Sequence, residues 1–256
     1  MNSKVEPVFR TISRCANVTA CLDEPDAPHP CRSIVQYQAR GGGDTYGKFQ
    51  VPEPWVGQID VAPILFVSSN PSIGKDDHSC GSTPDSTIWE SHHLAFGGGS
   101  RPYIIDGVWT TNEAVEKLKR VRYWSWVRKR AQELIPDRSV IPGIDYALTE
   151  IVHCKSEHEV GVVEAMQTCA DLHFENVMSV AAARVVIVVG SIARRQIFGT
   201  AEPEGLVERE MGGKPRLLTC LSHPAAFGDG KKFASRYSAN DVQRLADRLD
   251  KRRTWR

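Results

Sequence analysis

Side chains that can place water or move protons stand beside four short apolar runs of this sequence. The runs cover residues 64–67, 146–152, 185–189 and 217–221. The polar residues within or just after them are, in chain order, Asn70, Glu150, Ser191 and His223. Amide, carboxylate and imidazole groups gathered in one place are suited to hydrolysis. Ser191 is better explained as the N-cap of a following helix.

Three common catalytic motifs are absent. Gly74-Lys75 lacks the upstream glycine of a phosphate-binding loop, and Asp76 stands where a magnesium-binding Ser or Thr is needed. No His-x-Glu is paired with a later Pro-Cys-x-x-Cys, the pattern of zinc deaminases. Gly190-Ser191 does not open the Gly-x-Ser-x-Gly turn of a serine hydrolase. These three classes of enzyme are therefore excluded.

The apolar runs predict the elements that position these polar residues. Val and Ile dominate the runs without strict alternation, which is typical of parallel strands covered on both faces. Helices are predicted around them at residues 112–135, 160–182, 192–198 and 239–249. We therefore expect an α/β fold, a three-layer α/β/α sandwich with a central four-stranded, mainly parallel sheet. The polar residues should then meet at the carboxyl edge of that sheet.

The chain is predicted to form one globular unit with an N-terminal extension. Residues 1–58 are rich in Pro, Gly and Asp, which predicts an irregular arm packed on the domain. Residues 59–256 form the single α/β domain. Residues 75–107 are predicted to be a long loop on the ligand side of the sheet.

Composition bounds the class of protein. With 256 residues, 41% hydrophobic and 25% charged, the chain is expected to be globular rather than disordered. Its apolar stretches are far shorter than the roughly 18 residues that span a bilayer. The N-terminus lacks the apolar segment of about 7 to 15 residues found in secretory signals. We expect a monomer located in the cytoplasm, in a bacterial-type cytosol or nucleoid.

The net charge of +1 conceals an uneven distribution. Residues 117–130 hold seven basic and no acidic side chains, and residues 231–256 hold nine basic against three acidic. The rest of the chain is acidic. Clustered basic residues are expected on a surface that binds a polyanion, although such runs also occur as solvated helix faces.

The seven cysteines do not form a recognisable zinc or thioredoxin motif, because no Cys-x-x-Cys is present. A disulfide framework is not expected in a cytoplasmic chain of this size. Some of the cysteines are simply expected to be buried small apolar residues.

The order of these motifs resembles the uracil-DNA glycosylase superfamily. Residues 67–72 (Val-Ser-Ser-Asn-Pro-Ser) resemble its first motif, and residues 222–225 (Ser-His-Pro-Ala) are similar to its His-Pro-Ser or His-Pro-Ala motif. Residues 150–154, with Cys169 downstream, resemble the strand and cysteines of the iron-sulfur branches. Residues 30–35 echo the start of one such branch. The resemblance spans about residues 30–250 and indicates a divergent member closest to the iron-sulfur branches.

The resemblance implies a monofunctional DNA glycosylase. Such an enzyme flips uracil, or another deaminated or damaged base, out of DNA and hydrolyses its N-glycosidic bond, which initiates base excision repair. It implies that Asn70 holds the attacking water and that His223 donates to a carbonyl oxygen of the leaving base. Ser69, Ser72 and Phe96 are the further residues expected to contact the base, with Phe96 stacking on it.

Two positions depart from the family pattern. Glu150 stands where the family has an Asn that reads the edge of the base, and Ser72 is small where the most stringent branch has a bulky aromatic. Glu150 is therefore predicted either to bind the base with lower selectivity or to activate the water held by Asn70. A salt-bridged strand-end Glu is the alternative explanation. Both departures predict a broad range of substrates.

The resemblance also predicts DNA contacts. The loop after His223 should enter the minor groove, with Phe227 as a wedge and with basic side chains on phosphates. The predicted DNA-binding residues are Ser191, Phe227, Lys231, Lys232 and Arg236. The basic helix over residues 117–130 is expected near the duplex, although its aromatic stripe is equally typical of core packing.

An iron-sulfur cluster is the cofactor that the resemblance implies. Cys154 and Cys169 occupy the places of two ligands, and a [4Fe-4S] cluster needs four thiolates. Cys31 is the expected third ligand, Cys21 the expected fourth, and Cys15 an alternative fourth. The role of the cluster would be structural, because the hydrolysis itself needs no cofactor.

Two competing functions remain open from the sequence. Glu150 is compatible with a non-catalytic DNA- or RNA-binding protein on a degenerate glycosylase fold. An unrelated small-molecule hydrolase could use the same polar residues. The predicted partner under the first hypothesis is DNA that contains uracil or related lesions, and no membrane partner is expected.

Overall fold

A computed structural model of the chain describes residues 4–73, 79–94, 104–105, 108–109, 122–201 and 203–250. Its centre is a five-stranded sheet in the order β4-β1-β5-β7-β6. The strands are β1 (Ile64–Ser68), β4 (Tyr146–Glu150), β5 (Val185–Val189), β6 (Val207–Met211) and β7 (Lys214–Leu221). Strands β4, β1, β5 and β7 are parallel neighbours, and β6 is antiparallel to β7. The predicted α/β class is confirmed, and its four predicted strands are the parallel ones.

The predicted number of four strands is wrong, because the sheet also contains β6. The sequence of β6 is Val-Glu-Arg-Glu-Met, and only Met211 is buried. An edge strand of this kind has no continuous apolar run, so the pattern that reveals parallel strands does not detect it.

Side chains of the central strands alternate between two hydrophobic cores, one on each face of the sheet. In β1, Ile64 and Phe66 join one core, whereas Leu65 and Val67 join the other. In β5, Val186 and Val188 pack on the same side as Leu65. All five residues of each of these strands are buried, as a doubly covered sheet requires.

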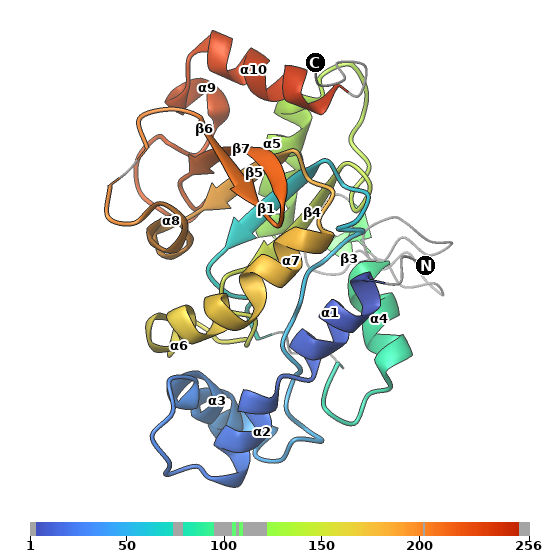
Figure 1. The fold of residues 1–256 in the computed structure, drawn as a ribbon, viewed down its shortest axis with the longest axis vertical. Coiled ribbons are helices and arrows are strands. Elements are labelled where there is room, and N and C mark those ends of the chain that lie inside the picture. Colours follow the sequence, from blue (N-terminus) through green and yellow to red (C-terminus); the bar gives the residue numbers. More distant parts are fainter. Residues whose placement is uncertain are drawn as a thin grey trace.

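Helices form the outer two layers (Figure 1). On one face lie α5 (Arg122–Leu134), α9 (Phe233–Arg236) and α10 (Ala239–Leu249). On the other lie α6 (Val162–Cys169), α7 (Glu175–Val180) and α8 (Ser191–Phe198). The predicted helix 160–182 is interrupted by the π-helical turn Ala170–Phe174. Of the predicted helix 112–135, the part before Arg122 lies outside the described residues.

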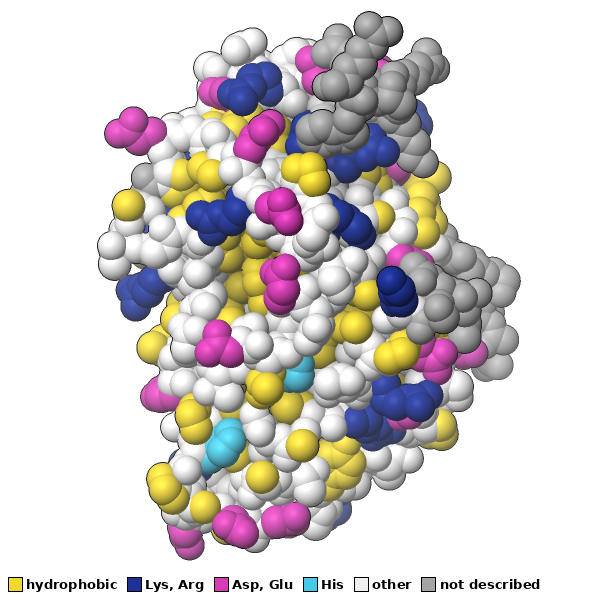
Figure 2. Space-filling view, in the orientation of Figure 1, with side chains coloured by type: hydrophobic (Ala, Val, Ile, Leu, Met, Phe, Trp, Pro, Cys, Tyr) yellow, Lys and Arg dark blue, Asp and Glu magenta, His cyan; other side chains and the backbone are white. Residues whose placement is uncertain are grey.

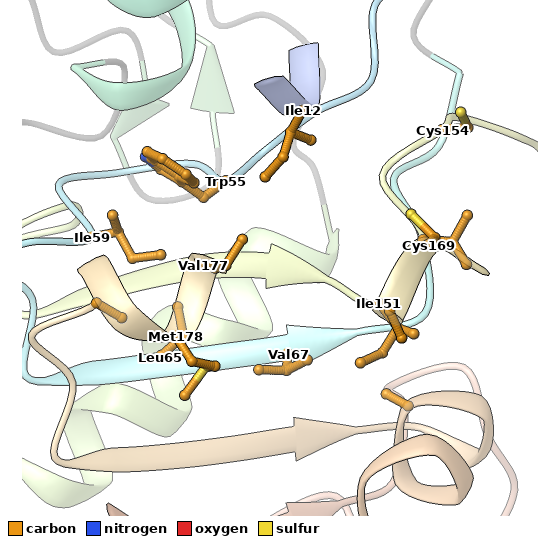
Figure 3. Close-up of a cluster of buried hydrophobic side chains, with 14 of the residues drawn as sticks. Ile12, Trp55, Ile59, Leu65, Val67, Ile151, Cys154, Cys169, Val177 and Met178 are labelled. Atoms are coloured by element: carbon orange, nitrogen blue, oxygen red, sulfur yellow. The ribbon is translucent and has the colours of Figure 1, made fainter. Parts of the chain in front are cut away.

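The N-terminal arm is helical, so the predicted irregular structure is wrong. It contains α1 (Val5–Ser13), α2 (Ala16–Asp23), α3 (Arg32–Gln38) and a π-helical turn (Ala39–Gly43). Helix α1 buries Val5, Phe9 and Ile12 against the main core. Figure 3 shows Ile12 and Trp55 above strand β1, which carries Leu65 and Val67. The helix-breaking residues near Gly41 and Pro52 follow the helices of the arm and do not prevent them from forming.

The predicted long loop over residues 75–107 also contains regular structure. Helix α4 runs over Asp85–His93, and a short hairpin pairs β2 (Ile104–Ile105) with β3 (Val108–Trp109). The guanidinium of Arg14 anchors α4 to the arm, because it bonds to Asp85 and to the carbonyl of Gly81. Residues 75–78, 95–103 and 106–107 of this segment lie outside the described residues.

One buried cation completes the core. The side chain of Arg216 is fully buried and donates to four backbone carbonyls, including those of Met178 and Ala181 at the end of α7. Carbonyls at the end of a helix lack partners within the helix, so Arg216 satisfies groups that burial would otherwise leave unpaired. Burial lowers the pKa of Arg216 to about 10.

The strand order places a switch point between β1 and β5 at the carboxyl edge of the sheet. After β1 the main sheet continues with β4 on one side, whereas after β5 it continues with β6 and β7 on the other. Adjacent strands whose connections leave in opposite directions mark the place where α/β sheets bind ligands. The segments around Asn70 and Ser191 follow these two strands directly.

The surface shown in Figure 2 mixes charges of both signs. On this face, the Lys and Arg side chains alternate with Asp and Glu rather than forming one continuous stripe. In the described part of the chain, no helix has both the length and the apolar character needed to cross a membrane.

Candidate active site

Asn70 is held by its amide nitrogen. Nδ2 donates to the carbonyl oxygen of Pro71 at 2.8 Å, and to the carbonyl and hydroxyl oxygens of Ser156 at 3.2 and 3.1 Å. Oδ1 has no hydrogen-bond donor among the described residues. The nitrogen contacts fix the orientation of the amide, so the carbonyl oxygen of Asn70 remains available to accept from water.

The loop 156–161 supports this motif from the next strand. Ser69 Oγ donates to Glu159 Oε1 at 2.7 Å, and the amide of Ser156 donates to the carbonyl of Pro71 at 3.1 Å. His158 and Glu159 both have positive φ values, 56° and 58°. Consecutive non-glycine residues in this conformation are strained, and such strain often accompanies functional sites. The loop thereby presents the exposed carboxylate of Glu159 beside Asn70.

His223 follows β7 and presents a defined nitrogen. The amide of Ala225 donates to His223 Nδ1 at 3.2 Å, so Nε2 carries the proton of the neutral ring. Burial lowers the pKa of His223; Glu159 opposes this effect and Lys231 reinforces it. At Gly190, after β5, an added Cβ would lie 3.7 Å from His223 Cβ. Asn70, Glu159 and His223 therefore all lie at the carboxyl edge of the sheet, near the switch point between β1 and β5.

Glu150 is buried below this rim. It is the register partner of Ser68 in the parallel pair of β1 and β4, and only 5% of its surface is exposed. Burial raises the pKa of Glu150 well above the usual value, Glu53 raises it further, and Lys155 and Ser68 oppose the rise. Lys155 is itself buried and pairs with Glu53 at 3.5 Å. Glu150 therefore belongs to a buried polar cluster, a position that does not suit the predicted activation of water beside Asn70.

Tyr123, at the start of α5, is a site residue that the sequence did not identify. Its ring stacks on His223, with centroids 5.5 Å apart and planes 18° apart. It also stacks on Trp126, with centroids 6.1 Å apart. The aromatic stripe in residues 117–130 was the available signal, but the same stripe is typical of core packing.

The other predicted base contacts have different outcomes. Ser72 is exposed at the end of the first motif. Phe96 lies outside the described residues. Ser191 is the exposed first residue of α8, and the N-cap is Gly190, so the predicted cap is wrong by one residue. Gly190 adopts φ 86° and ψ 170°, a conformation that favours glycine.

The loop after His223 projects an apolar side chain. Phe227 is fully exposed, and the loop is closed at its base by a hydrogen bond from the amide of Ser222 to the carbonyl of Gly230. Lys232 is exposed and Lys231 is half-buried. Arg236 instead turns inward, because its guanidinium donates to Cys220 Sγ and Tyr237 Oη, both at 3.1 Å. The predicted phosphate contact by Arg236 is therefore replaced by a role in bracing the loop.

A pocket between the arm and the sheet is lined by four cysteines: Cys15, Cys31, Cys154 and Cys169. Figure 3 shows Cys154 and Cys169 at the edge of the main core. Burial raises the pKa of each thiol, to about 12 for Cys31 and Cys169. Among the residues described, no three His, Cys, Asp or Glu side chains are already arranged around a metal position.

The fourth cysteine of this pocket is Cys15, the alternative fourth ligand, rather than Cys21. Cys21 lies on α2, and its carbonyl accepts from Gln36 on α3. Its thiol is nevertheless close enough to Cys31 and Cys154 to raise the pKa of both. The lining of the pocket favours Cys15, and the choice of fourth ligand stays a prediction.

Two buried histidines line the same pocket. His153 Nδ1 donates to the carbonyl oxygen of Glu53 at 2.8 Å, which leaves Nε2 buried without a partner. His173 Nδ1 is also buried without a partner. Unpaired polar atoms beside four thiols indicate that the pocket is suited to a polar or metallic occupant. Four thiols match the donor type and number of an iron-sulfur cluster.

Comparison with known proteins identifies no relative that would assign a function to this site. No protein-family model matches the chain, and no curated protein matches it significantly.

Proposed function

We propose that the protein is a DNA glycosylase that excises uracil or related deaminated bases. The observation that carries this proposal is the placement of Asn70 and His223 after parallel strands of one sheet, at its carboxyl edge. Asn70 has a fixed amide with an available carbonyl oxygen, and His223 has a proton on Nε2. Water placement and donation to a leaving group are the two services that this hydrolysis needs.

The chemistry assigns a separate role to each group. The transition state carries positive charge on the sugar, while negative charge gathers on the departing base. Asn70 Oδ1 would orient the water but would not take its proton, because an amide is not basic near neutrality. His223 Nε2 would donate to a carbonyl oxygen of the base. The exposed carboxylate of Glu159 would lie beside the cationic sugar and stabilise it electrostatically.

The loop after His223 supplies the DNA contacts in this proposal. Phe227 would fill the space left by the flipped base, since a fully exposed aromatic side chain has no function in the core. Lys231 and Lys232 would contact phosphates. Binding should therefore weaken as salt concentration rises.

The cysteine pocket supports a structural cofactor. Cys15 and Cys31 on the arm, with Cys154 and Cys169 on the domain, would hold a [4Fe-4S] cluster. Such a cluster would connect the arm to the sheet through metal–thiolate bonds, and the hydrolysis would proceed through the side chains alone.

The experiment that tests the proposal uses a duplex with one uracil. Abasic sites are detected by alkaline cleavage after incubation with the wild type, Asn70→Ala, His223→Ala and the exposed control Asn240→Ala. We expect cleavage with the wild type and the control, and a loss of at least about a hundredfold in the two site variants. Absence of cleavage with the iron-loaded wild type on uracil and other deaminated bases would overturn the proposal.

The burial of Glu150 favours one alternative function. A base-reading residue that is 5% exposed is compatible with a nucleic-acid-binding protein that has lost catalysis. That function predicts retarded migration of DNA without abasic sites. Neither retardation nor cleavage would favour a hydrolase of small molecules.

A further inference from the structure

Tyr123 spans the candidate site from one side to the other. Its ring stacks on the imidazole of His223. Its hydroxyl end is buried near Ser68 and Glu150, and this burial raises the pKa of the phenol. The side chain thus extends from the donor proposed for the leaving base to the carboxyl group at the position expected to read its edge.

The spacing leaves no room for a base between Tyr123 and His223. A flat ring occupies about 3.4 Å in a stack, so a base inserted between two rings needs about 7 Å. The centroids of Tyr123 and His223 are only 5.5 Å apart. The Trp126 ring also stacks on the tyrosine, with its centroid 6.1 Å away. Tyr123 therefore fills the space from this face of the imidazole to Glu150, which we call the closed arrangement.

The closed arrangement leaves two polar atoms unpaired. Tyr123 Oη and Glu150 Oε2 are both buried and form no hydrogen bond of normal geometry among the described residues, although Ser68 lies close to both. Each such atom costs about 1–3 kcal/mol of stability. Packing of the aromatic rings therefore stabilises this position of Tyr123. Burial of its hydroxyl group destabilises the same position. A ligand that supplies a partner for Glu150 would favour the open arrangement.

We propose that Tyr123 closes the base-binding site of the free protein and that a flipped base binds by displacing it. This inference rests on the proposed function, because it takes the occupant to be a pyrimidine base. The ring N–H of uracil would give Glu150 Oε2 the partner that Tyr123 does not provide. Displacement would also release the tyrosine hydroxyl to solvent. A base without a matching donor would leave Glu150 unpaired and would displace Tyr123 less readily.

The test measures binding rather than turnover. The probes are a duplex with 2′-fluoro-2′-deoxyuridine, chosen to resist excision, and the same duplex with 2′-deoxycytidine, whose ring nitrogen N3 carries no proton. Tyr123→Leu retains an apolar side chain against Trp126 but is too short to reach Ser68 and Glu150. We expect this variant to increase the preference for the uracil duplex about tenfold, as removal of a closed state populated about nine-tenths of the time predicts. Tyr123→Phe retains the ring but removes the hydroxyl that opposes closure, so it should strengthen the closed arrangement and lower the preference about fivefold.

Two controls separate closure from damage to the fold. Tyr146→Leu shortens a buried tyrosine at the opposite end of β4 and should leave the preference unchanged. Near-ultraviolet circular dichroism and thermal unfolding establish that each variant is folded. If Tyr123→Leu does not fold, Tyr123→His carries the test, because its shorter ring also cannot reach Glu150.

The outcomes distinguish this inference from the proposed function. Wild-type excision of uracil, combined with an unchanged or weaker preference in Tyr123→Leu, would overturn the closure and assign Tyr123 to supporting the base. A stronger preference in Tyr123→Leu supports it. If the wild type neither excises uracil nor distinguishes the two duplexes, the proposed function fails and the inference fails with it.

Discussion

Asn70 and His223 each use one polar atom for the fold and keep another for a ligand. Asn70 commits its amide nitrogen to Ser156 and Pro71, and His223 commits Nδ1 to the amide of Ala225. Asn70 Oδ1 and His223 Nε2 are the atoms left to bind a ligand. Because the committed atoms fix the orientation of the remaining ones, both residues are preorganised without a bound substrate.

Glu150 provides a test of the buried polar cluster by pH. Its pKa in the folded protein is raised by burial and by Glu53, so the folded state retains the proton to higher pH than the unfolded chain. Stability should therefore decrease as pH rises from about 4.3, the value for an unperturbed Glu, through the folded pKa. Glu150→Gln resembles the protonated form and should increase the free energy of unfolding at pH 8 by on the order of 1 kcal/mol.

Urea denaturation between pH 4 and pH 8.5 measures this effect. The difference between Glu150→Gln and the wild type should disappear near pH 4, where the wild-type side chain is protonated in both states. A variant that is less stable than the wild type at pH 8 would show instead that Glu150 is an ionised partner of Lys155.

A substitution at Phe227 should change the proposed activity without changing the stability of the fold. Its side chain is fully exposed, so Phe227→Ser should change the free energy of unfolding by less than about 0.5 kcal/mol. Excision from a duplex should fall about tenfold, which corresponds to about 1.4 kcal/mol. Excision from single-stranded DNA should change less, because no stacked neighbour has to be separated. The matched control is Val163→Ser, an exposed apolar residue on α6. Equal loss on both substrates would contradict a role as a wedge.

At the scale of elements, the loop 156–161 is held between two segments. The motif after β1 contacts it through Asn70 and Ser69, and α3 contacts it from the arm. Gly161 has φ 75°, and a Cβ at that position would lie 2.3 Å from the backbone nitrogen of Ile34. The close approach of α3 therefore requires glycine at this position.

Two glycine substitutions separate the cost of backbone strain from the cost of a steric clash with α3. Gly213 also has positive φ, 69°, but nothing lies within 4 Å of its added Cβ. Gly213→Ala should therefore cost about 1 kcal/mol, the cost of a left-handed residue. Gly161→Ala should cost at least about twice as much, because α3 must also move. Urea denaturation compares the two, and equal costs would show that α3 does not restrain the loop.

At the scale of the whole molecule, the arm and the sheet meet at the cysteine pocket. Cys15 precedes α2 and Cys31 precedes α3, whereas Cys154 follows β4 and Cys169 ends α6. A group bound to all four would connect segments far apart in the sequence. Closing such a long loop stabilises a fold mainly by restricting its unfolded chain.

Serine variants test which cysteines would hold the proposed cluster. Iron content and visible absorbance are measured on protein purified without oxygen. Cys15→Ser should lose at least about half of the iron, because one of four thiolates is removed. Cys21→Ser is the matched control, six residues away, and should retain the iron. The reverse result would restore Cys21 as the ligand, and a wild type without iron would contradict the cluster.

The sequence by itself predicted the parallel strands and the polar residues at their ends. Fully buried strands need continuous runs of Val and Ile, so the four runs identified the strands that later proved to be parallel neighbours. Those runs could not reveal β6, whose outward side chains are charged. They also could not reveal that residues 1–58 form helices, because these helices are stabilised by packing on the core rather than by their own propensity.

Only the tertiary structure decided which side chains face one another. Tyr123 and Glu159 joined the site because α5 and a strained loop bring them to His223 and Ser69, and neither contact has a spacing that could be recognised in the sequence. Burial likewise separated Glu150 from the accessible rim, and the fold placed Cys15, not Cys21, in the lining of the cysteine pocket. The physical reason is the same in each case. Strand patterns arise from local burial, whereas the geometry of a site depends on contacts between residues distant in the chain.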